Sequence, residues 1–119
     1  MSDKVVNRTI AGAVFLVSLI VYLMTMAATV SFWDAGEFIA TSYILGIPHS
    51  PGTPLYVLVG RVFCLLPLAM SIAQKVNLLS TVSAALGVLM AYLVMVNVVR
   101  LMFGRARSAA GMFVRYAGP

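Results

Sequence analysis

Two long apolar runs dominate the chain. The first covers residues 10–30 (IAGAVFLVSLIVYLMTMAATV) and contains no charged residue. A helix of this length measures about 31 Å, enough to cross the hydrocarbon core of a bilayer. A cleaved signal peptide is the alternative, but its apolar core is shorter, roughly 7–15 residues, and no clean Ala-x-Ala site precedes Ser31. We therefore expect a transmembrane helix at 10–30, after a cytoplasmic N-terminus at residues 1–9.

The second apolar run covers residues 76–102 and is long enough to cross a bilayer with some tilt. Small residues recur at every fourth position within it, at Ser83, Gly87 and Ala91. A face of small residues lets another helix approach closely in a membrane. The alternative is that this spacing arises by chance, since the span contains several Ala, Ser and Gly residues. We expect a second transmembrane helix at 76–102, with a helix partner inside or outside this chain.

The segment 31–75 lies between the two runs and is less uniform. Its most apolar part, Leu55–Met70, is short for a span and contains Arg61 and Pro67. An arginine at mid-bilayer depth costs at least about 2.5 kcal/mol on the insertion scale. A third span would also place the basic residues of the two chain ends on opposite sides of the membrane. We therefore predict a helix in or near the membrane interface, within an extracytoplasmic loop at 31–75.

Composition supports an all-α membrane protein. Of the residues, 62% are hydrophobic and 9% are charged, whereas soluble domains carry about 25% charged residues. Disorder is excluded, since it needs low hydrophobicity and high charge. The single cysteine, Cys64, rules out an internal disulfide framework.

The net charge of +5 does not indicate nucleic acid, because the cations flank the apolar runs. Lys4 and Arg8 precede the first run, and Arg100 and Arg105 end or follow the second. By the positive-inside rule both termini are cytoplasmic, with the chain in the cell (inner) membrane. The segment 103–119 is predicted to be a cytoplasmic tail that was cut off at the start of a further element.

Two acids follow the first run, Asp34 and Glu37 in SFWDAGEFIAT. On a helix, residues three apart share a face, and two close carboxylates raise each other's proton affinity, so that one can act as a base. The alternative is structural: Ser31 and Asp34 resemble a capping box at a helix start, with Glu37 facing water. Trp33 belongs at headgroup level beside them.

The stretch GIPHSPGTP at residues 46–54 is a stiff loop rich in proline and glycine. Thr53 and Pro54 are typical of the N-cap and first residue of the next helix. His49 is the only histidine of the chain; it is either an ordinary loop residue or a donor to an anionic group. Arg61 either snorkels to the interface or holds a phosphate. The sequence contains no Gly-rich phosphate loop and no HExxH motif. It therefore indicates no particular cofactor, and whether the protein binds a divalent metal is left open.

The run VSFWDAGEFIATSYILGIPHSPGTPLYVLVGRVFCLLP resembles the start of a family of large bacterial membrane proteins. That family is related to a eukaryotic transmembrane protein O-mannosyltransferase, and both are placed among the GT-C type glycosyltransferases. The likeness covers roughly residues 8–102, and its core is W-D-x-G-E-F followed by G-I-P-H-x-P-G-T-P-L-Y.

The resemblance implies the start of a GT-C multi-span fold with its active site on the extracytoplasmic side. Such enzymes take a sugar, mannose among the candidates, from a polyprenyl-phosphate donor. An acid in the first outer loop acts as base; it maps onto Asp34, with Glu37 as second candidate. The resemblance also implies short loop helices at 33–41 and 55–66. His49, Arg61 and Trp33 become candidates for substrate binding.

Family members are far longer, so this chain by itself is expected to be inactive and to need the remaining transmembrane helices. Two alternatives stay open. One is a non-catalytic small membrane protein that packs on partner helices through Ser83, Gly87 and Ala91. The other is a transporter fragment with Asp34 and Glu37 at a pore mouth, which the charge-free spans disfavour.

Overall fold

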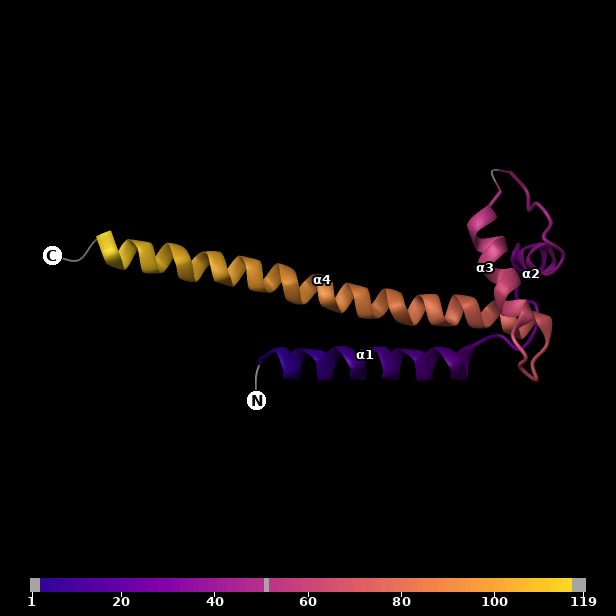
Figure 1. Ribbon diagram of the computed structural model, residues 1–119, viewed down its shortest axis with the longest axis horizontal. Helices are drawn as coiled ribbons and strands as arrows, with labels where there is room; N and C mark the ends of the chain where they lie inside the picture. Colours follow the sequence, from indigo (N-terminus) through magenta and orange to yellow (C-terminus); the bar gives the residue numbers. More distant parts are fainter. Residues whose placement is uncertain (1–2, 51, 117–119) are drawn as a thin grey trace.

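The computed structural model describes the backbone of residues 3–50 and 52–116 and the side chains of 5–50 and 52–102. Within these residues the chain is all-helical and has no strand, which confirms the predicted fold class. Four helices follow one another: α1 (Asp3–Thr25), α2 (Ala35–Ile44), α3 (Pro54–Leu65) and α4 (Ile72–Tyr116). In Figure 1 the long helices α1 and α4 lie side by side, and α2 and α3 gather at one end of the pair, which we call the head.

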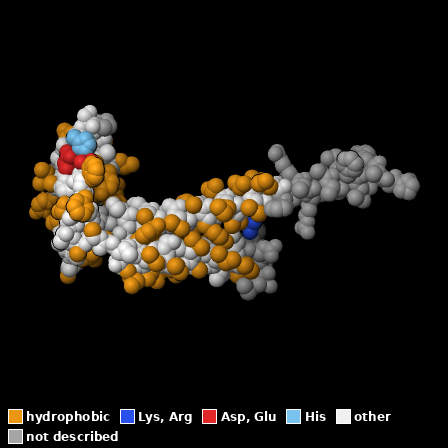
Figure 2. Space-filling view, turned by 180° about the vertical axis from the view of Figure 1, so that it is seen from behind, with side chains coloured by type: hydrophobic (Ala, Val, Ile, Leu, Met, Phe, Trp, Pro, Cys, Tyr) orange, Lys and Arg blue, Asp and Glu red, His pale blue; other side chains and the backbone are white. Residues whose placement is uncertain are grey.

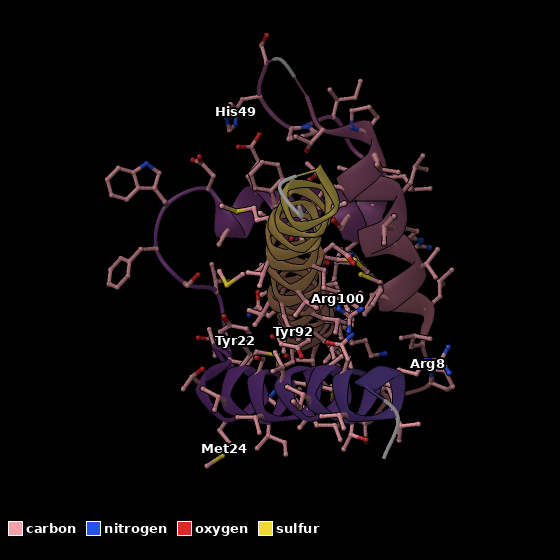
Figure 3. All side chains as sticks on the ribbon, turned by 90° about the vertical axis from the view of Figure 1, so that its left-hand side faces the viewer. Arg8, Tyr22, Met24, His49, Tyr92 and Arg100 are labelled. Carbon is pink, nitrogen blue, oxygen red and sulfur yellow. The ribbon has the colours of Figure 1, made fainter. Side chains whose placement is uncertain are left out.

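Helices α1 and α4 are both long and apolar enough to cross a membrane, over Val5–Thr25 and Ile72–Met102. They run antiparallel, so that the start of α1 and the far end of α4 point the same way (Figure 1). Most of their large apolar side chains are exposed in the chain, as suits a surface solvated by lipid. Ala85 is fully buried in α4, and the Tyr92 hydroxyl donates to Asn7 Oδ1 across the pair at 2.9 Å. Figure 3 shows Tyr92 on the side of α4 that faces α1.

The first helix is shifted relative to the predicted 10–30: it starts at Asp3 and ends at Thr25. Residues after Thr25 leave the helix although they are apolar. Their carbonyls have another partner, because Asn77 Nδ2 donates to the oxygens of Ala27 at 2.9 Å and Thr29 at 3.2 Å. The prediction placed the end of the helix wrongly because an apolar run does not reveal such a long-range contact.

Helix α4 extends beyond the predicted 76–102 at both ends. At its start Ser71 and Gln74 form a reciprocal capping box: Ser71 N donates to Gln74 Oε1 at 2.9 Å, and Gln74 N donates to Ser71 Oγ at 3.2 Å. At its other end the backbone stays helical to Tyr116, where a separate tail was expected. Alanine and arginine, both strong helix formers, are frequent in this stretch. The side chains of Lys4 and Arg105, used in the topology argument, lie outside the described residues, as do residues 117–119.

The head packs on the first turns of α4 through a small core of Ile39, Cys64 and Val76. Helix α3 ends two residues before Pro67, which cannot continue a helix, so it is shorter than the predicted 55–70. Lys75 Nζ donates to the free carbonyl of Leu66 at 2.8 Å and to that of Cys64 at 3.4 Å. In Figure 1, α3 runs roughly perpendicular to α4 at the end of the spans, as an interfacial helix would.

The small-residue face does not serve the α1–α4 contact. Ser83, Gly87 and Ala91 are all exposed, and a Cβ at Gly87 would meet no atom within 4 Å. Helix α1 packs on α4 without covering this face, and the buried residues in this part of α4 are Thr81 and Ala85. Within the described residues no helix of the chain covers this face, so of the two predicted partners, inside or outside the chain, only an outside one could occupy it.

Candidate functional site

Asp34 lies where the chain enters α2. It occupies the N-cap position, and its carbonyl accepts the first helical hydrogen bond, from Phe38 N at 3.0 Å. Its side chain makes no capping hydrogen bond. The capping box expected between Ser31 and Asp34 is therefore wrong: the helix starts at Ala35, three residues too late for Ser31 to cap it. Within the described residues the Asp34 carboxylate has no hydrogen-bond partner and stays exposed.

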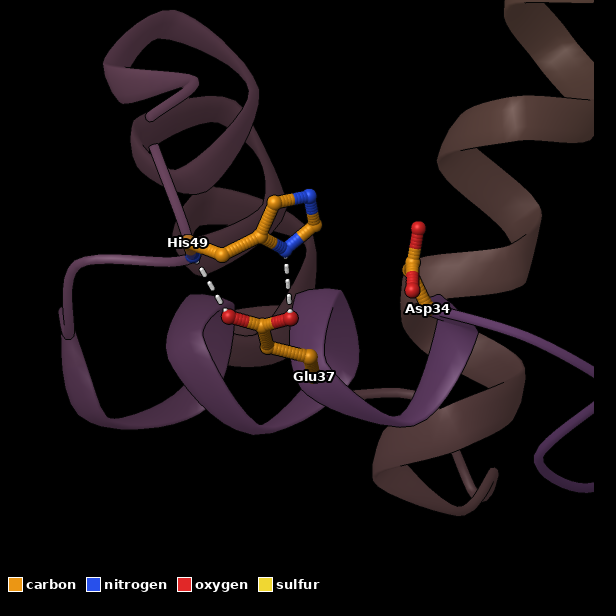
Figure 4. A group of neighbouring side chains, drawn as sticks. All are labelled: Asp34, Glu37 and His49. Carbon is orange, nitrogen blue, oxygen red and sulfur yellow. Dashed lines mark hydrogen bonds and ion pairs between the residues drawn. The ribbon is translucent and has the colours of Figure 1, made fainter. Parts of the chain in front are cut away.

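Glu37 and His49 form the best-defined contact of the site. Glu37 Oε1 accepts from the backbone N–H of His49 at 2.6 Å, and Oε2 lies 2.7 Å from His49 Nδ1 (Figure 4). The side chains of His49 and Glu37 are 54% and 38% exposed, respectively. The hydrogen bonds from His49 lower the pKa of Glu37, and the bond to Glu37 with the nearby negative charge raises the pKa of His49. Both shifts favour the charged pair.

This pairing corrects two expectations. Glu37 does not simply face water, and it does not share a proton with Asp34. A neighbouring carboxylate would raise the pKa of Glu37, whereas here the histidine contact lowers it. His49, in turn, is more than an ordinary loop residue, because it links the loop to α2 through both its backbone and its ring.

The proline-rich loop brings His49 to this place. Gly52 has φ +74, a conformation that side-chain-bearing residues rarely adopt, and its N–H donates to the His49 carbonyl at 2.9 Å. Thr53 is the N-cap of α3 and Pro54 its first residue, as predicted, although Thr53 makes no side-chain capping bond. Phe38 lies next to the His49 ring, with a distance of 6.1 Å between ring centroids.

Asp34, Glu37 and His49 each place one potential ligand atom within 4.8 Å of the others. Among the described residues, these three form the group that could hold a divalent cation. The donor set of two carboxylates and an imidazole suits one, although Glu37 Oε2 and His49 Nδ1 are already bonded to each other. The arrangement as it stands is an ion pair beside an unpartnered carboxylate.

The two other predicted binding residues are not part of this cluster. Arg61 donates to the Tyr43 carbonyl through Nη1, and its guanidinium lies 5.7 Å from the centre of the Tyr43 ring. Trp33 has a positive φ of 67. The residues Phe32 and Trp33 are each 93% exposed. Figure 2 shows the acids and the histidine together on the head, at the end of the molecule away from the basic residue visible on the spans.

Sequence reasoning missed several residues that shape the site. Asn77 holds the segment before Asp34, Lys75 binds the end of α3, and Gly60 lets α3 approach Ser42. Two signals were readable: Ser71-x-x-Gln74 is a capping box, and Asn77 is a polar residue in an apolar run. The contact between Gly60 and Ser42 had no sequence signal.

Two hollows border the head. One of about 290 Å³ lies between α2, α3 and α4 and is lined in part by Phe38, Tyr56 and Asn77. The other, of about 500 Å³, is mainly apolar and lies between the proline-rich loop and α3, beside Ile47 and Leu58. Neither lining includes Asp34, Glu37 or His49. The charged cluster is open to solvent, since the Asp34 side chain is exposed and that of His49 is 54% exposed.

Comparison with known proteins identifies relatives. The model of the family described as "Protein O-mannosyl-transferase TMEM260 N-terminal domain" matches residues 34–117. The chain is 33% identical over 81 residues to protein O-mannosyl-transferase tmem260 of Dictyostelium discoideum, covering 66% of this chain and 10% of the relative. It is 34% identical over 103 residues to protein O-mannosyl-transferase TMEM260 of Mus musculus, covering 85% of this chain and 14% of the relative. No solved structure matches significantly.

The matched residues include the whole head and α4, and thus Asp34, Glu37 and His49. The predicted resemblance to an O-mannosyltransferase is confirmed, although the chain spans only a small part of these relatives. The chain belongs to the TMEM260 N-terminal domain family.

Proposed function

We propose that the chain is the N-terminal part of a membrane glycosyltransferase that moves a sugar from a polyprenyl-phosphate donor to an acceptor hydroxyl on the extracytoplasmic face. The names of the relatives, protein O-mannosyl-transferases, favour mannose as the sugar and a protein hydroxyl as the acceptor. One observation carries the proposal: an unpartnered carboxylate, Asp34, stands nine residues after the last residue of a spanning helix, beside a fixed ion pair.

In this mechanism Asp34 is the base. The acceptor hydroxyl gives its proton to the Asp34 carboxylate as its oxygen forms a bond to the anomeric carbon of the sugar. The bond from that carbon to the phosphate oxygen breaks, and its electron pair leaves with the polyprenyl phosphate. A positioned base contributes about 10²–10⁴-fold, and holding donor and acceptor together contributes more.

The position of the head suits a lipid-linked donor. The phosphate of such a donor lies at the level of the headgroups, and α2 begins shortly beyond the end of α1. The exposed rings of Phe32 and Trp33 belong to that interfacial depth. We assign Trp33 and Arg61 to this boundary, Trp33 beside the sugar or its lipid and Arg61 at the headgroup phosphates.

Sidedness follows the charges. His49, Asp34 and Glu37 lie at the head. Arg8, in the first turns of α1, and Arg100, late in α4, lie towards the other end of the spans, as the course of the two helices in Figure 1 shows. The positive-inside rule then assigns the head to the extracytoplasmic side of the cell membrane and both ends of this chain to the cytoplasm.

The exposed small-residue face supports a second assignment. Ser83, Gly87 and Ala91 leave an unfilled side of α4 in the membrane. In the complete protein this face packs against further transmembrane helices. A Gly87→Leu variant is expected to lower the stability of the complete protein, while a Leu86→Ala variant nearby has a smaller effect.

The experiment that tests the function replaces Asp34 by Asn in the complete protein that contains this sequence. Transfer of labelled mannose from synthetic polyprenyl-phosphate mannose to a serine- and threonine-containing peptide is measured in membranes. We expect kcat to fall by about 10²–10⁴. An exposed loop substitution, Ser50→Ala, is the control. Full transfer by the Asp34→Asn variant would show that another group is the base.

A further inference from the structure

The two acids of the site are in different chemical situations. Both carboxylate oxygens of Glu37 are occupied, one by the backbone N–H of His49 and the other by Nδ1 of its ring. The Asp34 carboxylate makes no hydrogen bond within the described residues. Each hydrogen bond that a carboxylate accepts stabilises its charged form and makes it a weaker base, and the two bonds from His49 lower the pKa of Glu37. Glu37 is therefore poorly suited to the role of base, although it comes from the same motif as Asp34.

The contacts of Glu37 fix His49 in two ways. The backbone bond fixes the loop, and the ring bond fixes the rotation of the imidazole. With Nδ1–H donated to Glu37, the charged ring keeps one further donor, Nε2–H. This nitrogen points away from Glu37, on the side where Asp34 lies (Figure 4). The side chain of His49 is 54% exposed, so a ligand can reach it.

We infer that Glu37 is a positioning residue: it holds the His49 ring so that Nε2–H binds a phosphate oxygen of the lipid-linked donor, while Asp34 alone acts as base. This inference rests on the proposed function for the identity of the donor. The bound phosphate then lies next to Asp34, which is where the acceptor hydroxyl has to lose its proton.

The other charged groups of the head do not compete for this role. Among the described residues, the charged groups that face His49 are Glu37 and Asp34, both acidic. Arg61 on α3 is turned to Tyr43, and Lys75 on α4 binds the carbonyls at the end of α3. His49 is thus the cationic donor nearest to Asp34 in the described part of the chain.

The test compares Glu37→Gln with Glu37→Ala in the complete protein. Glutamine can still accept from the His49 backbone N–H, and its amide can donate to Nδ1, which leaves a neutral ring with the proton on Nε2. Alanine removes both contacts. A base would be lost equally in both variants, whereas a positioning residue is partly replaced by glutamine. Two readouts are taken: KM and kcat with polyprenyl-phosphate mannose, and the Kd of polyprenyl phosphate itself.

We expect Glu37→Ala to raise KM and Kd by about 10- to 100-fold and Glu37→Gln by about 3- to 10-fold, with kcat within about threefold of the unchanged protein. His49→Ala should match Glu37→Ala, and the double variant should be no weaker than His49→Ala alone. Ser50→Ala is the matched control in the same loop.

Equal loss of kcat in the Glu37→Gln and Glu37→Ala variants, with KM unchanged, would overturn the inference and make Glu37 a base. Additive losses in the double variant would overturn it as well. Failure of the proposed function is a different result: the unchanged protein then transfers no sugar, while the Kd series for polyprenyl phosphate still shows whether Glu37 acts through His49.

Discussion

The spanning pair of α1 and α4 and the head of α2 and α3 are stabilised in different ways. The pair is a long contact between two apolar helices, with a single described polar bond across it, from Tyr92 to Asn7. The head is short, and its elements are joined by bonds between residues far apart in sequence, such as Glu37 to His49 and Arg61 to Tyr43. The contact of the spanning pair is therefore spread along the two helices, whereas the head depends on a few specific contacts.

The close approach of α3 to α2 at Gly60 gives the largest predicted effect on stability. A Cβ added at Gly60 would lie 2.4 Å from Ser42 Oγ and 2.8 Å from Ser42 Cβ. Ser42 is fully buried, so α2 and α3 must separate. We expect Gly60→Ala to destabilise the protein by about 1–3 kcal/mol, measured as a lower Tm in detergent.

The control for this prediction is Gly12→Ala in α1, where an added Cβ meets no atom within 4 Å. That variant should be neutral or slightly stabilising, because alanine favours a helix more than glycine does. Adding Ser42→Gly to the Gly60→Ala variant should partly restore its stability. An unchanged Tm in the Gly60→Ala variant would mean that the two helices of the head are not in this close contact.

The two regions also differ in how well sequence reasoning predicts them. Hydropathy located both spans because lipid selects apolar residues along a whole helix. It missed the end of α1, which depends on Asn77, 48 to 50 residues away. In the head, Asp34 and His49 were recognised as chemical groups. The pairing of Glu37 with His49 was missed, because it depends on how the loop folds back on α2.

The ion pair predicts a window of pH in which the head is most ordered. The pKa of Glu37 is lowered from 4.5, so its contribution is complete above that value and lost as pH falls through the lowered pKa. The pKa of His49 is raised from 6.5, so its contribution is complete below that value and lost as pH rises through the raised pKa. The pair is therefore strongest between pH 4.5 and 6.5.

NMR of the ring protons of His49, the only histidine of the chain, measures this directly. The titration midpoint should lie above 6.5 and move down in the Glu37→Gln variant. The same midpoint in both proteins would show that the ring is not paired with Glu37 in solution.

The smallest effect is expected in the spanning pair. Tyr92→Phe removes the hydroxyl that donates to Asn7 Oδ1 and leaves the ring in place. Hydrogen bonds between transmembrane helices contribute about 0.6 kcal/mol on average, so the loss of stability should be near that value. Unfolding the Tyr92→Phe and Gly60→Ala variants side by side in detergent tests the comparison. A larger loss of stability for Tyr92→Phe than for Gly60→Ala would reverse the account of the two regions.

The central claim, that the head carries the reacting carboxylate on the outer face, is tested most directly by its sidedness. In a Cys64→Ala background, single cysteines are introduced by Ser50→Cys in the head and Ser108→Cys near the other end of α4. A membrane-impermeant thiol reagent is added to intact cells, and then to permeabilised cells. The account predicts modification at position 50 in intact cells and at position 108 only after permeabilisation. Modification at position 50 only after permeabilisation would place Asp34 in the cytoplasm and contradict it.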